Sequence, residues 1–321
     1  MRFGYLFVDI NINSILCLYI YIYLTFFYEM NFLEKEEIII DNITFDIKKN
    51  VKDVFTDVNT GVKTYSYHEE KIEIYDDETN IFFLFEIPFH EAFGHWIFES
   101  ATFLPFVKDF IHLSNFYILV NKNNERKYKK LFFNLFDIKD KNIYYMDNTD
   151  TYTDNISYKN IPKNNICIIC RNYCMNQNNI TEQCIEKYTY LLDNFYDIIM
   201  KDNDIILKEI EHLFLPRSKI ENYEPNNWRQ YDYHKFFNML KDKDYVEYDT
   251  INTYDFKKQI KLLQNSKNIY TNFGSSFLVN GFFSSNSNIY VVNKIENHIR
   301  DFTMNRIIIS IIEKKNNIIY M

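Results

Sequence analysis

The sequence has 321 residues, of which 47% are hydrophobic and 25% are charged, and its formal net charge is −8. These values exclude wholesale disorder, and the length suits two domains of about 150 residues each. Basic residues are dispersed among acidic ones, which argues against a nucleic-acid-binding surface. The 30 Phe and 27 Tyr beside only 5 Gly are typical of an AT-rich genome, such as that of a giant virus or a protist. Such a bias raises the frequency of chance motifs.

The N-terminal region contains an apolar stretch, residues 14–28, that is shorter than the ~20 residues of a membrane-spanning helix. Arg2 before it and the acidic residues 29–37 after it suit a signal anchor. Alternatively, Met30 is the initiator and residues 1–29 are an extension, or the stretch forms an edge strand. We expect a cytoplasmic protein, including a viral factory or virion, with a signal-anchored protein as the alternative. Only residues 14–28 suit membrane association.

In the first half of the chain, short apolar segments alternate with segments of helical periodicity. Strands are predicted at 38–40, 43–47, 63–67, 71–75, 81–87, 116–120, 142–146 and 166–169. Helices are predicted at about 90–105, 125–136 and 181–200. The alternation predicts parallel α/β layering, and the last helix with its polar end predicts the crossing between two domains.

The second half repeats this alternation. Strands are predicted at 212–215, 245–248, 268–271 and 288–292, the last of which closes the sheet. Helices are predicted at 233–240, 255–263, with Thr253 as the N-cap, and 277–283. The predicted organisation is an extension over 1–29, an acceptor-side α/β domain over 30–200 and a nucleotide-sugar-binding α/β domain over 201–321.

The predicted helix over 90–105 carries the strongest candidate for chemistry. Glu91, His95 and Glu99 are spaced four residues apart, so they form one polar line on an otherwise apolar helix. Acid–base groups in such a setting are costly unless they are used or paired. A zinc-protease HExxH site is excluded, because His90 and His95 are five apart and do not share a face.

A second candidate is the turn at residues 272–276, where a predicted strand passes into a helix. Gly274 permits a close backbone approach, and Ser275 and Ser276 add hydroxyl donors beside the helix N-terminus. Arg217 follows another strand, at the end of a parallel sheet where ligands collect. Such groups suit a phosphate. The alternatives are a structural N-cap at the turn and a surface ion pair at Arg217.

No metal site is expected from the cysteines or the acidic pairs. Cys167 and Cys170 belong to a predicted strand that points them to opposite faces, which favours reduced structural cysteines over zinc ligands. The Asp-x-Asp pairs at 202/204 and 242/244 are expected by chance among 44 acidic residues.

Four segments in order resemble the family 61 glycosyltransferases. Residues 95–99 followed by Pro105 are similar to the family's His-x-x-x-Asp/Glu segment, and 213–217 to its strand-then-Arg. Residues 256–260 are similar to Phe-x-x-Gln-Ile, and 274–280 to Gly-Ala/Ser-x-Leu-x-Asn. The resemblance covers about residues 80–293. The chain departs from it at 272–273, where the family often has His, and at Lys219 or Arg229, where the family has a second Arg.

The resemblance implies an α/β fold of two Rossmann-like domains facing a cleft, which is a GT-B-like arrangement. It implies an inverting, metal-independent transfer from a UDP-sugar to a glycan or protein acceptor, with no cofactor. The implied catalytic residues are His95 and Glu99. The implied nucleotide-sugar-binding residues are Arg217, Lys219, Asn272, Gly274, Ser275, Ser276 and Asn280. The alternative is a catalytically inactive glycan- or nucleotide-binding structural relative.

Overall fold

The computed structural model describes most of the chain after residue 35. The described residues are 36–56, 63–69, 79–85, 93–113, 115–121, 127–146, 156–158, 160–171, 181–201, 209–216, 233–248, 255–292 and 303–321. The predictions for residues 1–29, for Met30 as the start and for a strand at 71–75 lie outside these ranges.

A six-stranded sheet organises the first half, with strand order β1-β2-β9-β5-β6-β7. Its strands are β1 (Glu37–Ile40), β2 (Ile43–Lys49), β5 (Asn80–Leu84), β6 (Phe116–Asn121), β7 (Ile143–Met146) and β9 (Asn165–Cys170). The last four of these pair in parallel, whereas β1 and β2 add an antiparallel edge. Every side chain of β9 is buried, as expected for a parallel strand that is covered on both faces.

A small antiparallel sheet, β4-β3-β8, was not predicted as a separate layer. It consists of β3 (Val51–Thr56), β4 (Lys63–Tyr67) and β8 (Ile156–Tyr158). Val51 and Val54 of β3 join one buried cluster with Cys167, whereas Cys170 belongs to the other cluster. The prediction that the two cysteines point to opposite faces of their strand is therefore confirmed.

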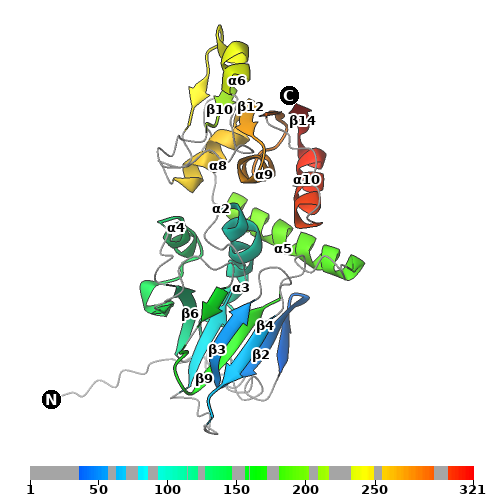
Figure 1. Ribbon diagram of the computed structural model, residues 1–321. Coiled ribbons are helices and arrows are strands. Elements are labelled where there is room, and N and C mark those ends of the chain that lie inside the picture. Colours follow the sequence, from blue (N-terminus) through cyan, green and yellow to red (C-terminus); the bar gives the residue numbers. More distant parts are fainter. Residues whose placement is uncertain are drawn as a thin grey trace, which may run out of the picture.

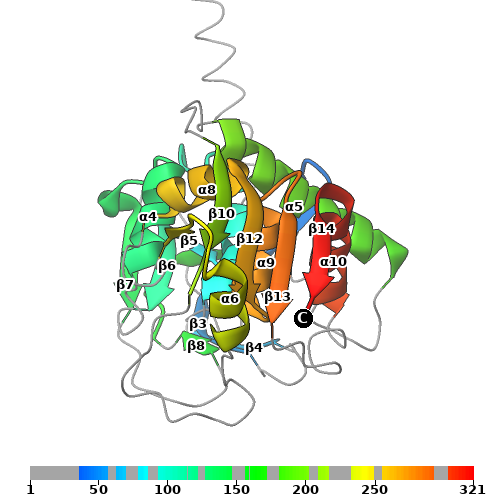
Figure 2. The same cartoon turned by 90° about the horizontal axis from the view of Figure 1, so that it is seen from above.

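A wholly parallel sheet organises the second half, with order β11-β10-β12-β13-β14. Its strands are β10 (Ile210–Phe214), β11 (Val246–Glu247), β12 (Ser266–Asn272), β13 (Asn288–Val292) and β14 (Asn317–Tyr320). Seen from above, β10, β12, β13 and β14 follow one another across the sheet, with α10 (Thr303–Lys315) beside β14 (Figure 2). The prediction that 288–292 closes the sheet is wrong, because β14 lies outside β13. Together the parallel strands of the two sheets confirm the predicted α/β class.

Five of the helices lie where the sequence pattern predicted them, whereas α10 was not predicted. These five are α4 (Lys127–Leu135), α5 (Glu182–Lys201), α6 (Tyr233–Leu240), α8 (Phe256–Gln264) and α9 (Ser275–Phe282). The N-cap of α8 is Asp255, whose side chain accepts from the N–H of Lys258 at 3.0 Å, and not Thr253 as predicted. Within the described ranges, no helix combines the length and apolar character needed to cross a membrane.

Each parallel sheet has one point at which the winding direction reverses. In the first sheet the chain runs from β5 to β6 and β7, and β9 then returns to the other side of β5. In the second sheet β11 lies on one side of β10, and β12 lies on the other. Ligands of open α/β sheets bind at the carboxyl ends of the strands at such a reversal. These positions are the ends of β5 and β9, and the ends of β10 and β12.

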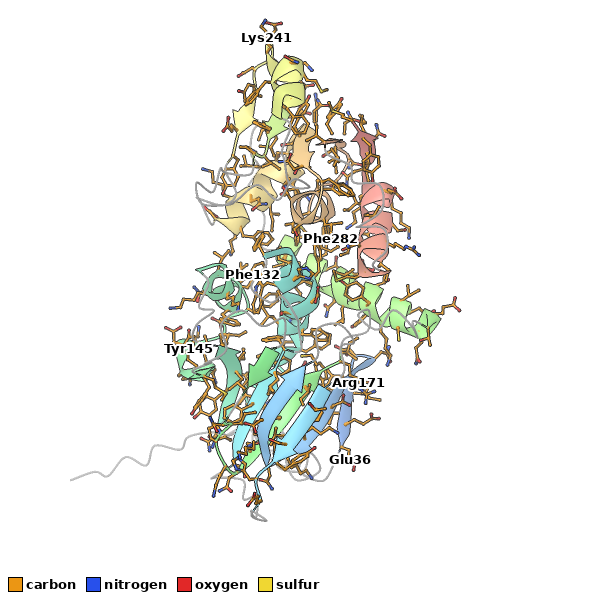
Figure 3. All side chains as sticks on the ribbon, viewed as in Figure 1. Glu36, Phe132, Tyr145, Arg171, Lys241 and Phe282 are labelled. Atoms are coloured by element: carbon orange, nitrogen blue, oxygen red, sulfur yellow. The ribbon has the colours of Figure 1, made fainter. Side chains whose placement is uncertain are left out.

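The two halves lie one above the other, with α5 between the two sheets (Figure 1). Buried residues of both halves form one continuous apolar core. The ring centroids of Phe132 and Phe256 are 5.0 Å apart, and the ring centroids of Phe98 and Phe282 are 5.5 Å apart. Figure 3 shows Phe132 and Phe282 at this junction. Aromatic pairs add about 0.5–1.5 kcal/mol each beyond area burial, so this packing fixes one half on the other.

Candidate functional site

The segment after β5 is helical but irregular. It consists of α2 (Phe93–His95), a π-helical turn (Trp96–Ser100), a 3₁₀ turn (Ala101–Phe103) and α3 (Leu104–Val107). The N–H of Ala101 donates to the carbonyl of Trp96, five residues earlier. The N–H of Leu104 donates to the carbonyl of Ala101, because Pro105 has no N–H with which to continue an α-helical ladder. The predicted helix is therefore confirmed as helical from residue 93 onward, but it is irregular, and the widened turn is of a kind often found at functional sites.

His95 and Glu99 form a hydrogen-bonded pair on this segment, as their spacing predicted. Nδ1 of His95 contacts Oε1 of Glu99. The Glu99 side chain is only 2% exposed, whereas that of His95 is 35% exposed. Oε2 of Glu99 is buried and has no hydrogen-bond partner among the described residues. The imidazole is therefore the accessible member of the pair, and the carboxylate lies behind it.

The pair has perturbed acid–base properties. Burial raises the pKa of Glu99 above its usual value, and the contact with His95 reverses this only in part. Burial lowers the pKa of His95, but the hydrogen bond and the charge of Glu99 outweigh this effect. The net pKa of His95 therefore lies above its ordinary value. A partly exposed histidine that is hydrogen-bonded to a buried carboxylate is suited to moving protons.

A turn follows β12 as the sequence predicted, although α9 begins at Ser275, two residues before the predicted helix. Gly274 has φ +105° and ψ −153°, a region that is strained for any residue with a Cβ. It precedes α9 without a side-chain cap, and the first helical bond runs from the N–H of Leu278 to the Gly274 carbonyl at 3.0 Å. Ser275 is exposed and Ser276 is half-buried. The free first-turn N–H groups and two hydroxyls make a site that favours an anion.

A buried polar network holds this turn from beneath. The amide of Asn280 donates to Ser276 Oγ at 3.1 Å and to Thr271 Oγ1 at 3.2 Å. Its oxygen accepts from Nε2 of Gln259 at 2.8 Å, and the two hydroxyls are 2.9 Å apart. Asn280 is only 1% exposed. Its amide is thus committed to the protein, and its effect on a ligand at this turn is exerted through Ser276.

The two candidate segments meet in space. A Cβ added to Gly94 would lie 2.8 Å from Cβ and 2.9 Å from Oγ of Ser275. These distances leave no room for a side chain at position 94. Gly94 is the residue before His95, and Ser275 is the first residue of α9. The backbone that carries the acid–base pair therefore lies directly against the predicted anion-binding turn.

Two comparisons with known proteins gave no assignment. A scan against models of protein families found no match. A search of curated proteins also found none.

The structure brings some of the predicted site residues together and buries others. His95, Glu99, Gly274, Ser275 and Ser276 are brought together through the contact between α2 and α9. Asn272 and Asn280 belong to the same β12–α9 unit but are buried beneath it. The predicted residues Arg217 and Lys219, together with Glu91 and Arg229, lie outside the described residues.

In the part of the chain that the structure describes, no group of three or more His, Cys, Asp or Glu side chains is arranged to hold a metal ion.

Three residues beside this site were not predicted from the sequence. Gly94 could have been, because a glycine next to His95 is a signal in a chain with only five. Lys129 of α4 is 3% exposed, and its Nζ lies 5.3 Å from the centre of the Trp96 ring. Tyr188 of α5 donates its hydroxyl to the carbonyl of Phe98 at 3.1 Å. No local sequence pattern indicates Lys129 or Tyr188, because their contacts join segments that are far apart in the chain.

Replacing Gly94 by Ala should force Ser275 away from α2. Overpacking of this kind costs about 1–3 kcal/mol, which exceeds the gain in helix propensity of about 1 kcal/mol. Thermal unfolding should therefore show a less stable protein. The double variant Gly94→Ala/Ser275→Gly should recover most of the loss, because the nearest remaining atom, the Ser275 Cα, lies 3.5 Å away. A Gly94→Ala protein as stable as wild type would contradict the contact.

Proposed function

We propose that this protein is an inverting, metal-independent glycosyltransferase that transfers a sugar from a UDP-sugar to a hydroxyl of a glycan or protein acceptor. In this proposal the two halves are Rossmann-like domains of a GT-B-like fold, and no cofactor takes part. The order of the four motifs that resemble family 61 glycosyltransferases supports this assignment.

One observation carries the proposal, namely the contact between Gly94 and Ser275. Each residue follows a strand at a point of winding reversal: Gly94 follows β5, and Ser275 follows β12. The two positions where ligands are expected therefore belong to facing elements of the two halves. A nucleotide-sugar needs both positions. Its diphosphate requires hydrogen-bond donors, whereas its reacting carbon requires a base that activates the acceptor.

His95 is the proposed general base and Glu99 the residue that orients it. The exposure of His95 allows contact with an acceptor, and Glu99 occupies Nδ1. In this proposal Nε2, the ring nitrogen that does not contact Glu99, takes the proton of the acceptor hydroxyl. The acceptor oxygen forms the new bond to the anomeric carbon as the bond to the UDP oxygen breaks on the opposite face. Glu99 stabilises the imidazolium that results.

The leaving diphosphate is the proposed ligand of the Gly274 turn. Without a metal, its negative charge must be met by hydrogen-bond donors and cations. The N–H groups of the first turn of α9 and the hydroxyls of Ser275 and Ser276 supply the donors. Arg217 and Lys219 are the cations that the resemblance assigns, and β10, which precedes them, pairs with β12.

The test is to incubate the protein with a panel of UDP-sugars and a mixture of glycan and peptide acceptors, and to measure the UDP released. Acceptor-dependent release is the expected result. The alternative is an inactive binding relative, and the near-complete burial of Glu99 is the observation that favours it. An inactive binding relative would bind UDP in calorimetry but would release no UDP from any UDP-sugar.

Replacing Arg217 by Ala should weaken UDP binding, because a charge-assisted hydrogen bond of about 1.5–3 kcal/mol is lost. Isothermal titration calorimetry measures this change. Lys267→Ala is the matched control, because Lys267 pairs with Glu209 and Glu211 at the opposite, amino end of β12. Equal UDP affinity in the Arg217 variant and wild type would remove Arg217 from the site.

A further inference from the structure

Tyr188 links α5 to the irregular segment at the residue before Glu99. Its hydroxyl donates to the Phe98 carbonyl at 3.1 Å, and the side chain is only 4% exposed. Thr102 Oγ1 donates to the same carbonyl at the longer distance of 3.4 Å. Tyr188 is therefore the closer of these two side-chain donors to this part of the backbone.

The Phe98 carbonyl lies where the backbone bonds change their spacing. The Trp96 carbonyl, two residues before Phe98, accepts from the N–H of Ala101, five residues later in the chain. The Ala101 carbonyl, three residues after Phe98, accepts from the N–H of Leu104, only three residues later. Ser100, inside the transition, has φ −114° and ψ −56°, away from ideal helical values. Carbonyls at such irregularities are commonly satisfied by side chains inserted from neighbouring elements.

We propose that Tyr188 is a positioning residue, whose hydroxyl keeps the Trp96–Ser100 turn widened and thereby sets the direction in which Glu99 faces His95. Its effect on sugar transfer rests on the proposed function, whereas its effect on the His95–Glu99 pair does not.

The physical reason is the geometry of a widened turn. A turn with one additional residue rotates the following helix by about 100° relative to the preceding one. Both sides of the turn are anchored in the core, because Ile97 is 0% exposed and Leu104 is 1% exposed. If the turn relaxed to α-helical spacing, the rotation would have to be taken up within the turn itself, which holds Glu99. The Tyr188 hydroxyl opposes this relaxation, since a buried carbonyl that loses its donor is costly.

The experiment is an NMR titration of the His95 ring in wild type and in Tyr188→Phe, with His95→Gln used to assign the resonance. In wild type the pKa of His95 should lie above its ordinary value, because the contact with Glu99 outweighs burial. In Tyr188→Phe it should fall, because burial remains while the contact weakens. Turnover of a UDP-sugar should fall by about 3- to 10-fold with UDP affinity unchanged.

Tyr196→Phe is the matched control, because it removes a hydroxyl from the same helix. Its ring stacks on Phe283 with the centroids 6.1 Å apart, and its hydroxyl bonds to Gln264. It should change neither the His95 pKa nor turnover. Thr102→Val is a second test variant and should shift the His95 pKa in the same direction by a smaller amount.

An unchanged His95 pKa in folded Tyr188→Phe and in Thr102→Val would overturn the inference. A pKa shift in a protein that transfers sugar from no UDP-sugar would support the positioning role and overturn the proposed function. The two failures are therefore distinguishable.

Discussion

Substituting Gln for His95 should lower the turnover number by about 10²- to 10⁴-fold while the affinity for UDP stays close to wild type. Gln keeps a polar side chain of similar reach but cannot take a proton at neutral pH. The base is needed only when the acceptor hydroxyl attacks, so its loss affects the transition state and not nucleotide binding. Steady-state kinetics and UDP calorimetry on the same preparation separate the two effects.

His68→Gln is the control for this experiment. Nε2 of His68 lies 3.0 Å from the Ile161 carbonyl, a contact confined to the first half, so its loss should not alter turnover of the folded protein. If His95→Gln weakens UDP binding as strongly as it slows turnover, then His95 is a nucleotide ligand and not the base.

Replacing Glu99 by Gln should lower turnover by about 100-fold with UDP affinity nearly unchanged. The substituted amide can still accept a hydrogen bond from His95 but cannot stabilise the imidazolium by its charge. The pH dependence of kcat/KM gives a second readout, because the base must be neutral to act. In wild type the rate should rise with pH and level off above the raised pKa of His95. In Glu99→Gln this rise should move to lower pH, because burial then lowers the pKa without an opposing charge.

Glu91→Gln is the comparison for Glu99→Gln, since both were predicted on one line of the helix. Only the Glu99 change should affect the rate. Equal and small effects of both changes would exclude this pair as the source of the base and would direct the search to the second half. A large fall in melting temperature with normal turnover would instead assign Glu99 a structural role.

The sequence predicted the local parts of this molecule well. The strands of both parallel sheets follow short apolar runs, and the Gly274 turn lies where a strand passes into a helix. The pairing of His95 and Glu99 followed from their spacing, because residues four apart share a helix face. These features depend on near neighbours in the chain, which is why periodicity and turn chemistry indicate them.

Other features depend on longer-range geometry and were missed. The helix α10 was missed although its polar residues Arg306, Ser310 and Glu313 recur at helical spacing, because its run of β-branched Ile residues favours a strand, and β14 was missed with it. The widened turn at Trp96–Ser100 is a choice of hydrogen-bond register, which residue propensities do not determine, although Pro105 was a signal. The contact of Gly94 with Ser275 joins segments far apart in the sequence, and a single sequence contains no signal for such a pair.

The most direct test of the proposed function is the configuration of the new glycosidic bond, measured by proton NMR on a reaction run in excess chelator. In the proposed mechanism, a hydroxyl activated by His95 attacks opposite the diphosphate at the Gly274 turn, and no metal takes part. We therefore predict full transfer in chelator with the anomeric configuration inverted relative to the donor. Retained configuration, or transfer that appears only when magnesium or manganese is restored, would contradict it.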